Sequence, residues 1–280
     1  MTIQYLNRKN GKIAYEITGE GPLVVCVPSL GDVRGEYRFL TPSLVKAGYR
    51  VVVMDPRGHG ESSTGWDDYS VAGVGDDIVA LIRELNAGPA IVLGTSMGGG
   101  AAIWSAVEAP ELVRGMIMVN PFVDGDGDKF LVFVLSILFA RPWGPAAWKM
   151  YYKSLYPTRK PADFVEYITA LTDNLKQHGR LEAVMGMLRA SKRASGERMP
   201  KVTQPALVIM GSKDPDFKNP EAEAMRIAEA VCGRYSMIEN AGHYPHAEMP
   251  DITGPIILAV LKDYHENTEN KVVRNREARR

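Results

Sequence analysis

The 280-residue sequence has little cysteine, no excess charge of either sign and no long apolar run. Its two cysteines, Cys26 and Cys232, form neither a disulfide framework nor a metal-ligand spacing. Lysine plus arginine and aspartate plus glutamate each number 33, so the charge gives no reason to expect nucleic acid or an anionic membrane as a partner. The longest apolar run covers residues 130–140, whereas a membrane-spanning helix needs about 20 residues. We therefore expect no membrane span.

Signals for targeting and for cofactors are also missing from the sequence. The first residues, MTIQYLNRKNGK, lack the charged and apolar regions of a signal peptide, so a cytoplasmic location is expected. No metal-ligand cluster and no nucleotide-binding loop can be seen, so neither a metal nor another cofactor is expected. A homodimer remains open. Apolar residues make up 45% and charged residues 24%, which is typical of a globular domain.

Short apolar runs alternate with helical patterns along most of the chain. Residues 3–18 predict two strands joined at Asn10-Gly11, a strong hairpin signal. The later apolar runs are typical of parallel strands covered on both faces, and they occupy residues 23–27, 51–54, 90–93, 116–119, 206–210 and 235–238. Helical patterns between them cover residues 36–47, 76–86 and 221–232. This order predicts an α/β fold with a doubly wound, mostly parallel, eight-stranded sheet.

One interval, residues 121–202, interrupts the alternation. It contains no convincing strand, and its helical patterns cover residues 127–139, 144–155, 161–176 and 179–194. We interpret residues 121–202 as a helical cap inserted into a core made of residues 1–120 and 203–265, followed by a polar, frayed tail at 266–280. Because residues 130–140 are apolar on every side, we expect that helix to be buried, with Phe133, Phe139 and Trp143 lining a substrate pocket.

A serine surrounded by glycines follows the apolar run at residues 90–93, in the sequence Gly94-Thr95-Ser96-Met97-Gly98. A serine hydroxyl is a poor nucleophile unless it projects from a sharp turn toward a base. Glycines two residues before and two after the serine relieve the crowding of such a turn, and Gly-x-Ser-x-Gly between a strand and a helix is the nucleophile elbow. The amide of Met97 would then lie at a helix N-terminus, where negative charge is favoured.

The sequence resembles the α/β-hydrolase superfamily over residues 3–265, and four further stretches carry the resemblance. They are Pro28-Ser29-Leu30-Gly31-Asp32, where the family usually shows His-Gly; the DPRGHGES loop at 55–62; Asp214 in GSKD; and His243 in GHYPH. The resemblance implies that Ser96 is the nucleophile, His243 the base and Asp214 the acid that orients it. It also implies an oxyanion hole formed by the amides of Leu30 and Met97.

Other polar residues leave alternatives open. Asp216, two residues after Asp214, and Asp124, which follows the strand at 116–119, are the two other candidates for the acid. We interpret His246 as a structural neighbour of His243. Arg57 and His59 are expected to hold their own loop in place.

The residue at the elbow separates the activities that the resemblance implies. Epoxide hydrolases and haloalkane dehalogenases of the superfamily carry aspartate there, so Ser96 favours acyl chemistry: hydrolysis of a carboxylic ester, lactone or thioester of an apolar small molecule. Hydrolysis of a carbon–carbon bond and cofactor-free perhydrolysis use the same residues and remain alternatives. A small-molecule receptor with slow turnover is an alternative from a different class. The sequence does not name the physiological substrate.

Overall fold

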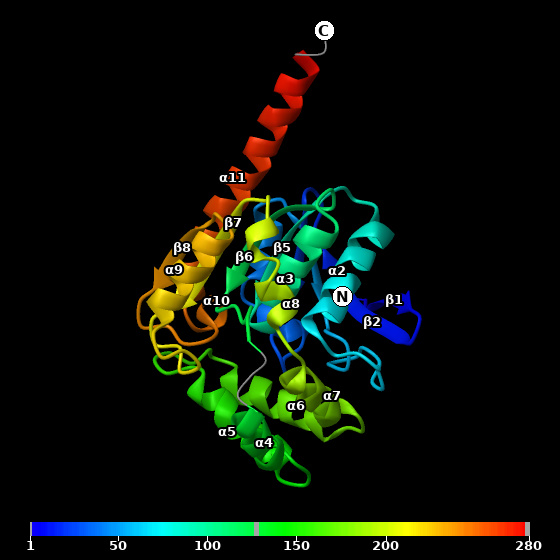
Figure 1. Cartoon of the computed structure of the whole chain (residues 1–280), viewed down its shortest axis with the longest axis vertical. Coiled ribbons are helices and arrows are strands. Elements are labelled where there is room, and N and C mark those ends of the chain that lie inside the picture. The colour runs from blue at the N-terminus through cyan, green and yellow to red at the C-terminus, as the bar shows by residue number, and fades with distance from the viewer. Residues whose placement is uncertain (1, 126–128, 278–280) are drawn as a thin grey trace.

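An eight-stranded sheet forms the centre of the structure, a computed structural model that describes residues 2–125 and 129–277 (Figure 1). The strand order is β1-β2-β4-β3-β5-β6-β7-β8. Their bounds are β1 (Gln4–Arg8), β2 (Gly11–Thr18), β3 (Leu23–Val27), β4 (Arg50–Met54), β5 (Ala90–Thr95), β6 (Val113–Val119), β7 (Ala206–Gly211) and β8 (Arg234–Ile238). The pairs β1–β2 and β2–β4 are antiparallel and all others are parallel, which confirms the predicted mostly parallel sheet.

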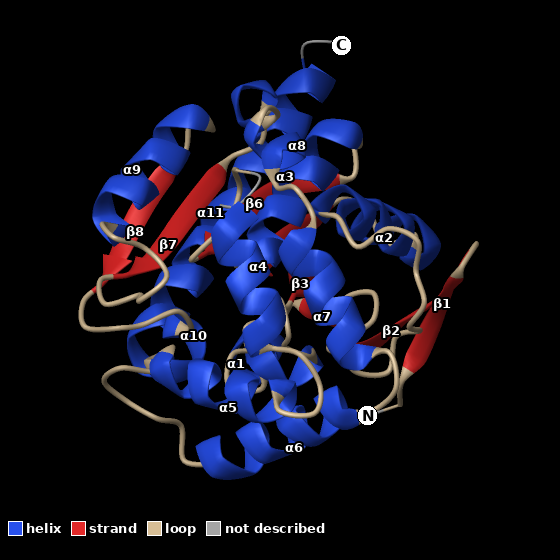
Figure 2. Ribbon diagram, turned by 60° about the horizontal axis from the view of Figure 1, so that its bottom comes forward, coloured by secondary structure: helices blue, strands red, loops and turns tan. Residues whose placement is uncertain are grey.

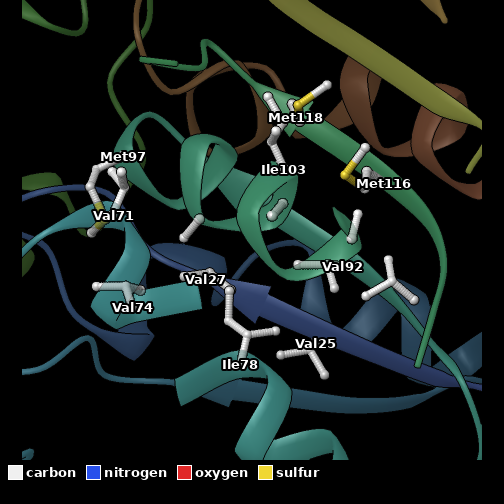
Figure 3. Packing of buried hydrophobic residues seen from close by; sticks show 14 of the residues in the cluster. Val25, Val27, Val71, Val74, Ile78, Val92, Met97, Ile103, Met116 and Met118 are labelled. Carbon is white, nitrogen blue, oxygen red and sulfur yellow. The ribbon is translucent and has the colours of Figure 1, made fainter. Parts of the chain in front are cut away.

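Helices cover both faces of the sheet, as the fully apolar strands require. Along β3, Val25 and Val27 belong to a buried cluster that also contains residues of α2 (Val71–Leu85), α3 (Met97–Glu108) and α9 (Pro220–Ala230), and Figure 3 shows part of this packing. The alternate residues Val24 and Cys26 belong to a second buried cluster, which contains residues of η1 (Arg34–Tyr37), α1 (Thr41–Lys46) and α11 (Pro250–Glu277). The strand period of two therefore divides the apolar side chains between two buried layers.

The helices that separate the strands begin and end at side chains suited to those positions. Ser70 accepts a hydrogen bond from the Gly73 amide at the start of α2, and Asn86 ends that helix in the left-handed conformation. Asn219 caps α9 in the same way, immediately before Pro220. These side chains bind backbone groups that have no partner within the helix, and so fix where α2 and α9 begin.

Between β6 and β7 the chain forms helices and, within the described residues, no strand. These elements are α4 (Lys129–Leu138), α5 (Gly144–Ser154), α6 (Phe164–Lys176), α7 (Arg180–Arg189), α8 (Arg193–Gly196) and η2 (Met199–Lys201). Figure 2 views the molecule from the end where α4, α5, α6 and α7 gather. The helical patterns predicted from the sequence match the first four helices closely. A further short helix, α10 (Pro245–Glu248), follows β8.

Two expectations from the sequence are wrong. The described part of the run at 130–140 is not buried all round, because Val134, Ile137 and Leu138 are exposed on α4. Residues 266–277 are not a frayed end, because α11 continues to Glu277 and projects from the body of the molecule (Figure 1). Residues 256–277 contain neither glycine nor proline, so nothing in that sequence breaks the helix. No described helix is long and apolar enough to cross a membrane.

Candidate active site

Ser96 lies at a strained turn between β5 and α3. Its backbone has φ 54° and ψ −118°, a conformation that residues with a side chain rarely adopt. The turn is held by three backbone hydrogen bonds: the Ser96 amide donates to Val119 O (2.8 Å), and the Ser96 carbonyl accepts from Gly99 (2.9 Å) and Phe122 (3.0 Å). Neighbouring segments thus enforce the strain, which is typical of a nucleophile elbow.

The glycines on either side of Ser96 are required by close backbone contacts. A Cβ atom on Gly94 would lie 2.1 Å from the Gly98 carbonyl oxygen. A Cβ atom on Gly98 would lie 2.3 Å from the carbonyl oxygen of Val27, at the end of β3. Only glycine fits at either position, and the contact with Val27 brings the loop after β3 against the elbow.

That loop, residues 28–32, offers an amide that could bind an oxyanion. The Gly31 amide is occupied, because it donates to Nε2 of His59 at 3.0 Å. Burial lowers the pKa of His59 to about 4, so its imidazole is neutral and can accept this bond. Among the described residues, no group is found that accepts a hydrogen bond from the Leu30 amide. Met97 is the first residue of α3. Its amide can bind an oxyanion, because the first amides of a helix have no acceptor within the helix.

His243 and Asp214 form a buried hydrogen-bonded pair at the ends of β8 and β7. His243 Nδ1 lies 2.7 Å from Asp214 Oδ2, and both side chains are buried. The Asp214 carboxylate also accepts from the Asn120 side-chain amide (2.5 Å) and from the Asp216 backbone amide (3.0 Å). Because Nδ1 donates to the carboxylate, Nε2 of His243 is left as the proton acceptor.

The two groups shift each other's pKa. Burial alone would raise the pKa of Asp214, but the charge and the hydrogen bond of His243 outweigh it and lower that pKa below its usual value. Burial alone would lower the pKa of His243, but Asp214, together with Asp216 and Glu36, raises it to about 9. Asp214 is therefore ionised at neutral pH, and His243 is a stronger base than an ordinary imidazole.

Phe122 connects the serine with the histidine. Its amide donates to the Ser96 carbonyl, and its ring centroid lies 6.3 Å from that of His243. Ser96 and His243 are thus neighbours of the same residue, although they are far apart in the sequence. Ser96 itself is only 6% exposed. A substrate can reach it only if the covering residues leave a path or move.

The two alternative acids occupy different environments. The Asp124 side chain is exposed and lies 3.8 Å from the Arg226 guanidinium. Asp216 Oδ2 lies 3.7 Å from His243 Nδ1, and the Asp216 carboxylate accepts a hydrogen bond from the Tyr151 hydroxyl on α5. Distance therefore favours Asp214 as the partner of His243, with Asp216 as a second carboxylate nearby.

The remaining polar residues have structural partners. His246 Nε2 lies 3.3 Å from Glu36 Oε1 in the interior without forming a hydrogen bond, and its ring stacks on that of Tyr37. Arg57 donates to Asp77 at 2.9 Å and to the Gly73 carbonyl at 2.7 Å. These contacts fit the predicted role of Arg57 in holding its loop.

The three aromatic residues expected to line a pocket differ in burial. Phe139 is 3% exposed and packs edge-on against Trp148, in a cluster that also contacts Leu30. Phe133 is 61% exposed and Trp143 53% exposed, and the Trp143 indole donates to the Ile137 carbonyl. Phe139 is thus buried beside Leu30, whereas the exposure of Phe133 and Trp143 does not support a role for them in lining a pocket.

Sequence reasoning missed two residues of this site. Asn120 binds Asp214 through Nδ2 and the Gly211 amide through Oδ1 (3.2 Å). Its position directly after the apolar run 116–119, at the end of a strand, could have indicated it. Nothing in the sequence indicated that Tyr151 belongs to the site, because aromatic residues in a helical pattern usually pack in a core.

Among the described residues, Asp214, Asp216 and His243 also form one cluster with ligand atoms close enough to hold a metal ion. Their oxygens already accept hydrogen bonds from Asn120 and Tyr151 as well as from within the cluster. We therefore interpret the three side chains as members of a hydrogen-bond network.

A cavity of about 470 Å³ lies elsewhere, between η1 and α6, and contains none of the residues above. Its walls include Arg34, Asp55 and Tyr167. The candidate site is thus separate from this cavity.

Comparison with known proteins agrees with this geometry. The family described as the alpha/beta hydrolase fold matches residues 22–250. This range includes the elbow, Asp214 and His243. The chain belongs to this family. The α/β-hydrolase is similar to the AB hydrolase superfamily protein YfhM of Bacillus subtilis, at 26% identity over 87% of this chain and 91% of that protein.

Two further proteins similar to this α/β-hydrolase are enzymes by name. The 3-oxoadipate enol-lactonase 2 of Acinetobacter baylyi is 26% identical over 78% of this chain and 80% of its own. The structure of a thermophilic esterase from Thermogutta terrifontis superposes with a TM-score of 0.80 at 22% identity, covering 95% of this chain and all of that one (100%). The structural likeness at that identity concerns the fold.

Proposed function

We propose that this α/β-hydrolase is a serine hydrolase that cleaves carboxylic esters, including lactones or thioesters, of apolar small molecules. The observation that carries the proposal is the strained Ser96 between Gly94 and Gly98, which Phe122 links to the buried pair of His243 and Asp214. The enol-lactonases among the similar proteins support the same class of reaction.

The proposed mechanism follows from the roles these groups can take. Ser96 Oγ attacks the acyl carbon while Nε2 of His243 takes its proton. The amides of Leu30 and Met97 bind the oxyanion of the tetrahedral intermediate. The imidazolium then protonates the leaving group, which leaves an acyl ester on Ser96. A water molecule, deprotonated by His243, hydrolyses that ester and releases the acid.

We assign residues 121–202 to a cap over a core of residues 1–120 and 203–265. The cap contributes an apolar cluster that contacts Leu30 and contains Phe139, Trp148, Leu175, Val184 and Met185. A pocket with such a wall favours apolar groups, since each buried methylene contributes about 0.8 kcal/mol.

Esters with medium acyl chains are therefore expected to have a higher kcat/KM than acetate. Phe139→Ala should change this preference, because it opens space beside Leu30, and should change acetate hydrolysis much less. The exposed residue Phe133 provides the matched control, since Phe133→Ala should leave the preference as it is. The measurement is kcat/KM for p-nitrophenyl esters from acetate to decanoate.

A profile that peaks at acetate in the wild type, and that Phe139→Ala does not alter, would contradict the proposed role of the cap. Whatever the chain-length preference, the protein is an enzyme only if each molecule hydrolyses many ester molecules.

The pH dependence should reflect the raised pKa of His243. The imidazole must be neutral to accept the serine proton, so activity is lost as the pH falls through its pKa. Because Asp214 raises that pKa to about 9, kcat/KM should rise along one limb on the alkaline side of 6.5, the ordinary imidazole value. Asp214 stays ionised over this range and adds no second limb. An optimum in acid would contradict the assignment of His243 as the base.

A second candidate function is a small-molecule receptor that turns over its ligand slowly. It is favoured by the exposed apolar face of the insertion, made of Phe133, Val134, Ile137, Leu138 and Trp143, because such faces often bind partner proteins. Counting p-nitrophenol released per protein molecule separates the candidates: many turnovers identify a hydrolase, and a single slow turnover identifies a receptor.

A further inference from the structure

Helix α5 contacts the loops that carry the proposed catalytic groups. The ring of Trp148 lies against Gly31, where an added Cβ atom would be 2.1 Å from ring atom Cζ2. The Leu155 carbonyl, at the end of the helix, accepts from the His243 amide at 3.0 Å. Tyr151 lies between these two positions, and residues three or four apart share one face of a helix. One face of α5 therefore covers the site.

On this face of α5, the Tyr151 hydroxyl contacts Asp216 in the loop after β7. It lies 2.9 Å from Oδ1 and 2.7 Å from Oδ2 of Asp216, and it is the donor because the carboxylate can only accept. The same Oδ2 lies 3.7 Å from Nδ1 of His243, beyond hydrogen-bond distance. Asp216 thus lies between the hydroxyl group of α5 and the imidazole.

We propose that Tyr151 and Asp216 form a positioning pair through which the helical insertion sets the basicity of His243. Tyr151 binds the Asp216 carboxylate and keeps it away from Nδ1, which leaves Asp214 as the hydrogen-bond partner. The inference rests on the proposed function, since it takes His243 as the base.

The charges around the imidazole determine the sign of the effect. Three carboxylates act on His243: Asp214 and Asp216 from the loop after β7, and Glu36 from η1. A carboxylate near the ring stabilises the imidazolium and raises its pKa. Loss of the Tyr151 hydroxyl leaves Asp216 free to approach Nδ1, so the pKa of His243 should rise. Loss of the Asp216 charge should lower it.

The test is a double-mutant cycle with the pKa of His243 as the readout. Tyr151→Phe should raise that pKa and Asp216→Asn should lower it, each by at least about half a pH unit. The variant carrying both substitutions should behave like Asp216→Asn alone, because the hydroxyl acts only through the carboxylate. The same order should appear in the limb of kcat/KM against pH.

Tyr156→Phe is the matched control. Tyr156 follows the same helix and is buried, but its hydroxyl lies 3.4 Å from that of Tyr152 and not at Asp216. This variant should leave the pKa of His243 unchanged. Thermal unfolding of each variant shows that it is folded before its titration is compared.

The titration should also be followed by NMR in the Ser96→Ala protein, with the His243 signal assigned by its loss in His243→Gln. This readout needs no turnover, so it separates the positioning pair from the proposed function. An unchanged His243 pKa in Tyr151→Phe, or strictly additive shifts in the double variant, overturns the pair. The expected cycle of pKa shifts, together with a wild-type protein that hydrolyses no ester, would instead overturn the proposed function.

Discussion

Ser96→Ala is expected to abolish ester hydrolysis, with a loss of about 10⁶-fold in kcat, because no other group can form the acyl ester. Covalent labelling by a fluorophosphonate should disappear with it. The matched control is Ser105→Ala, since Ser105 is buried in the helix that follows the elbow and its hydroxyl donates to the Ala102 carbonyl. That variant should be labelled as the wild type is.

The strain at position 96 provides a second measurement on the same residue. Glycine adopts a positive φ without the cost that alanine meets, so Ser96→Gly should lose activity as fully as Ser96→Ala but unfold at a higher temperature. Labelling that persists in Ser96→Ala would show that another residue is the nucleophile. Equal unfolding temperatures would show that the turn stores no strain.

Asp214→Asn is expected to lower kcat by about 10⁴-fold, because an amide in this position favours the wrong tautomer of the histidine. Asp216→Asn should cost far less, since Asp216 Oδ2 lies 3.7 Å from Nδ1 of His243 whereas Asp214 Oδ2 lies 2.7 Å from it. The two variants carry the same change of charge and differ only in position, so each controls for the other. The measurement is single-substrate kinetics at a pH where His243 is neutral.

A larger loss from Asp216→Asn would make Asp216 the acid and Asp214 a supporting group. A small loss from Asp214→Asn, abolished by adding Asp216→Asn, would show that Asp216 can replace Asp214. In that case the Tyr151 hydroxyl would be the group that normally prevents the exchange, because it holds the Asp216 carboxylate.

Local signals in the sequence were enough to predict the sheet and the elbow, whereas the pairing of Asp214 with His243 was expected from the resemblance to the α/β-hydrolase superfamily. Each of the short apolar runs became a strand, as is typical of parallel strands covered on both faces, and Asn10-Gly11 became the turn between β1 and β2. The Gly-x-Ser-x-Gly spacing predicted the turn at Ser96 because the crowding that it relieves arises within a few residues of the chain. Such a motif can be recognised in the sequence because the residues that cause its conformation lie within the motif.

The environment of those residues was decided by the tertiary structure alone. Asn120, Asp214 and His243 meet because β6, β7 and β8 are neighbours, and no local pattern shows which side chain accepts from which. The exposure of Phe133 and the burial of Phe139 depend on how α4 lies on the other helices of the insertion. The contact of Tyr151 with Asp216 joins residues 65 positions apart. Contacts of this range depend on how whole elements pack together, and the apolar pattern of a helix fixes which face is buried without stating what it meets.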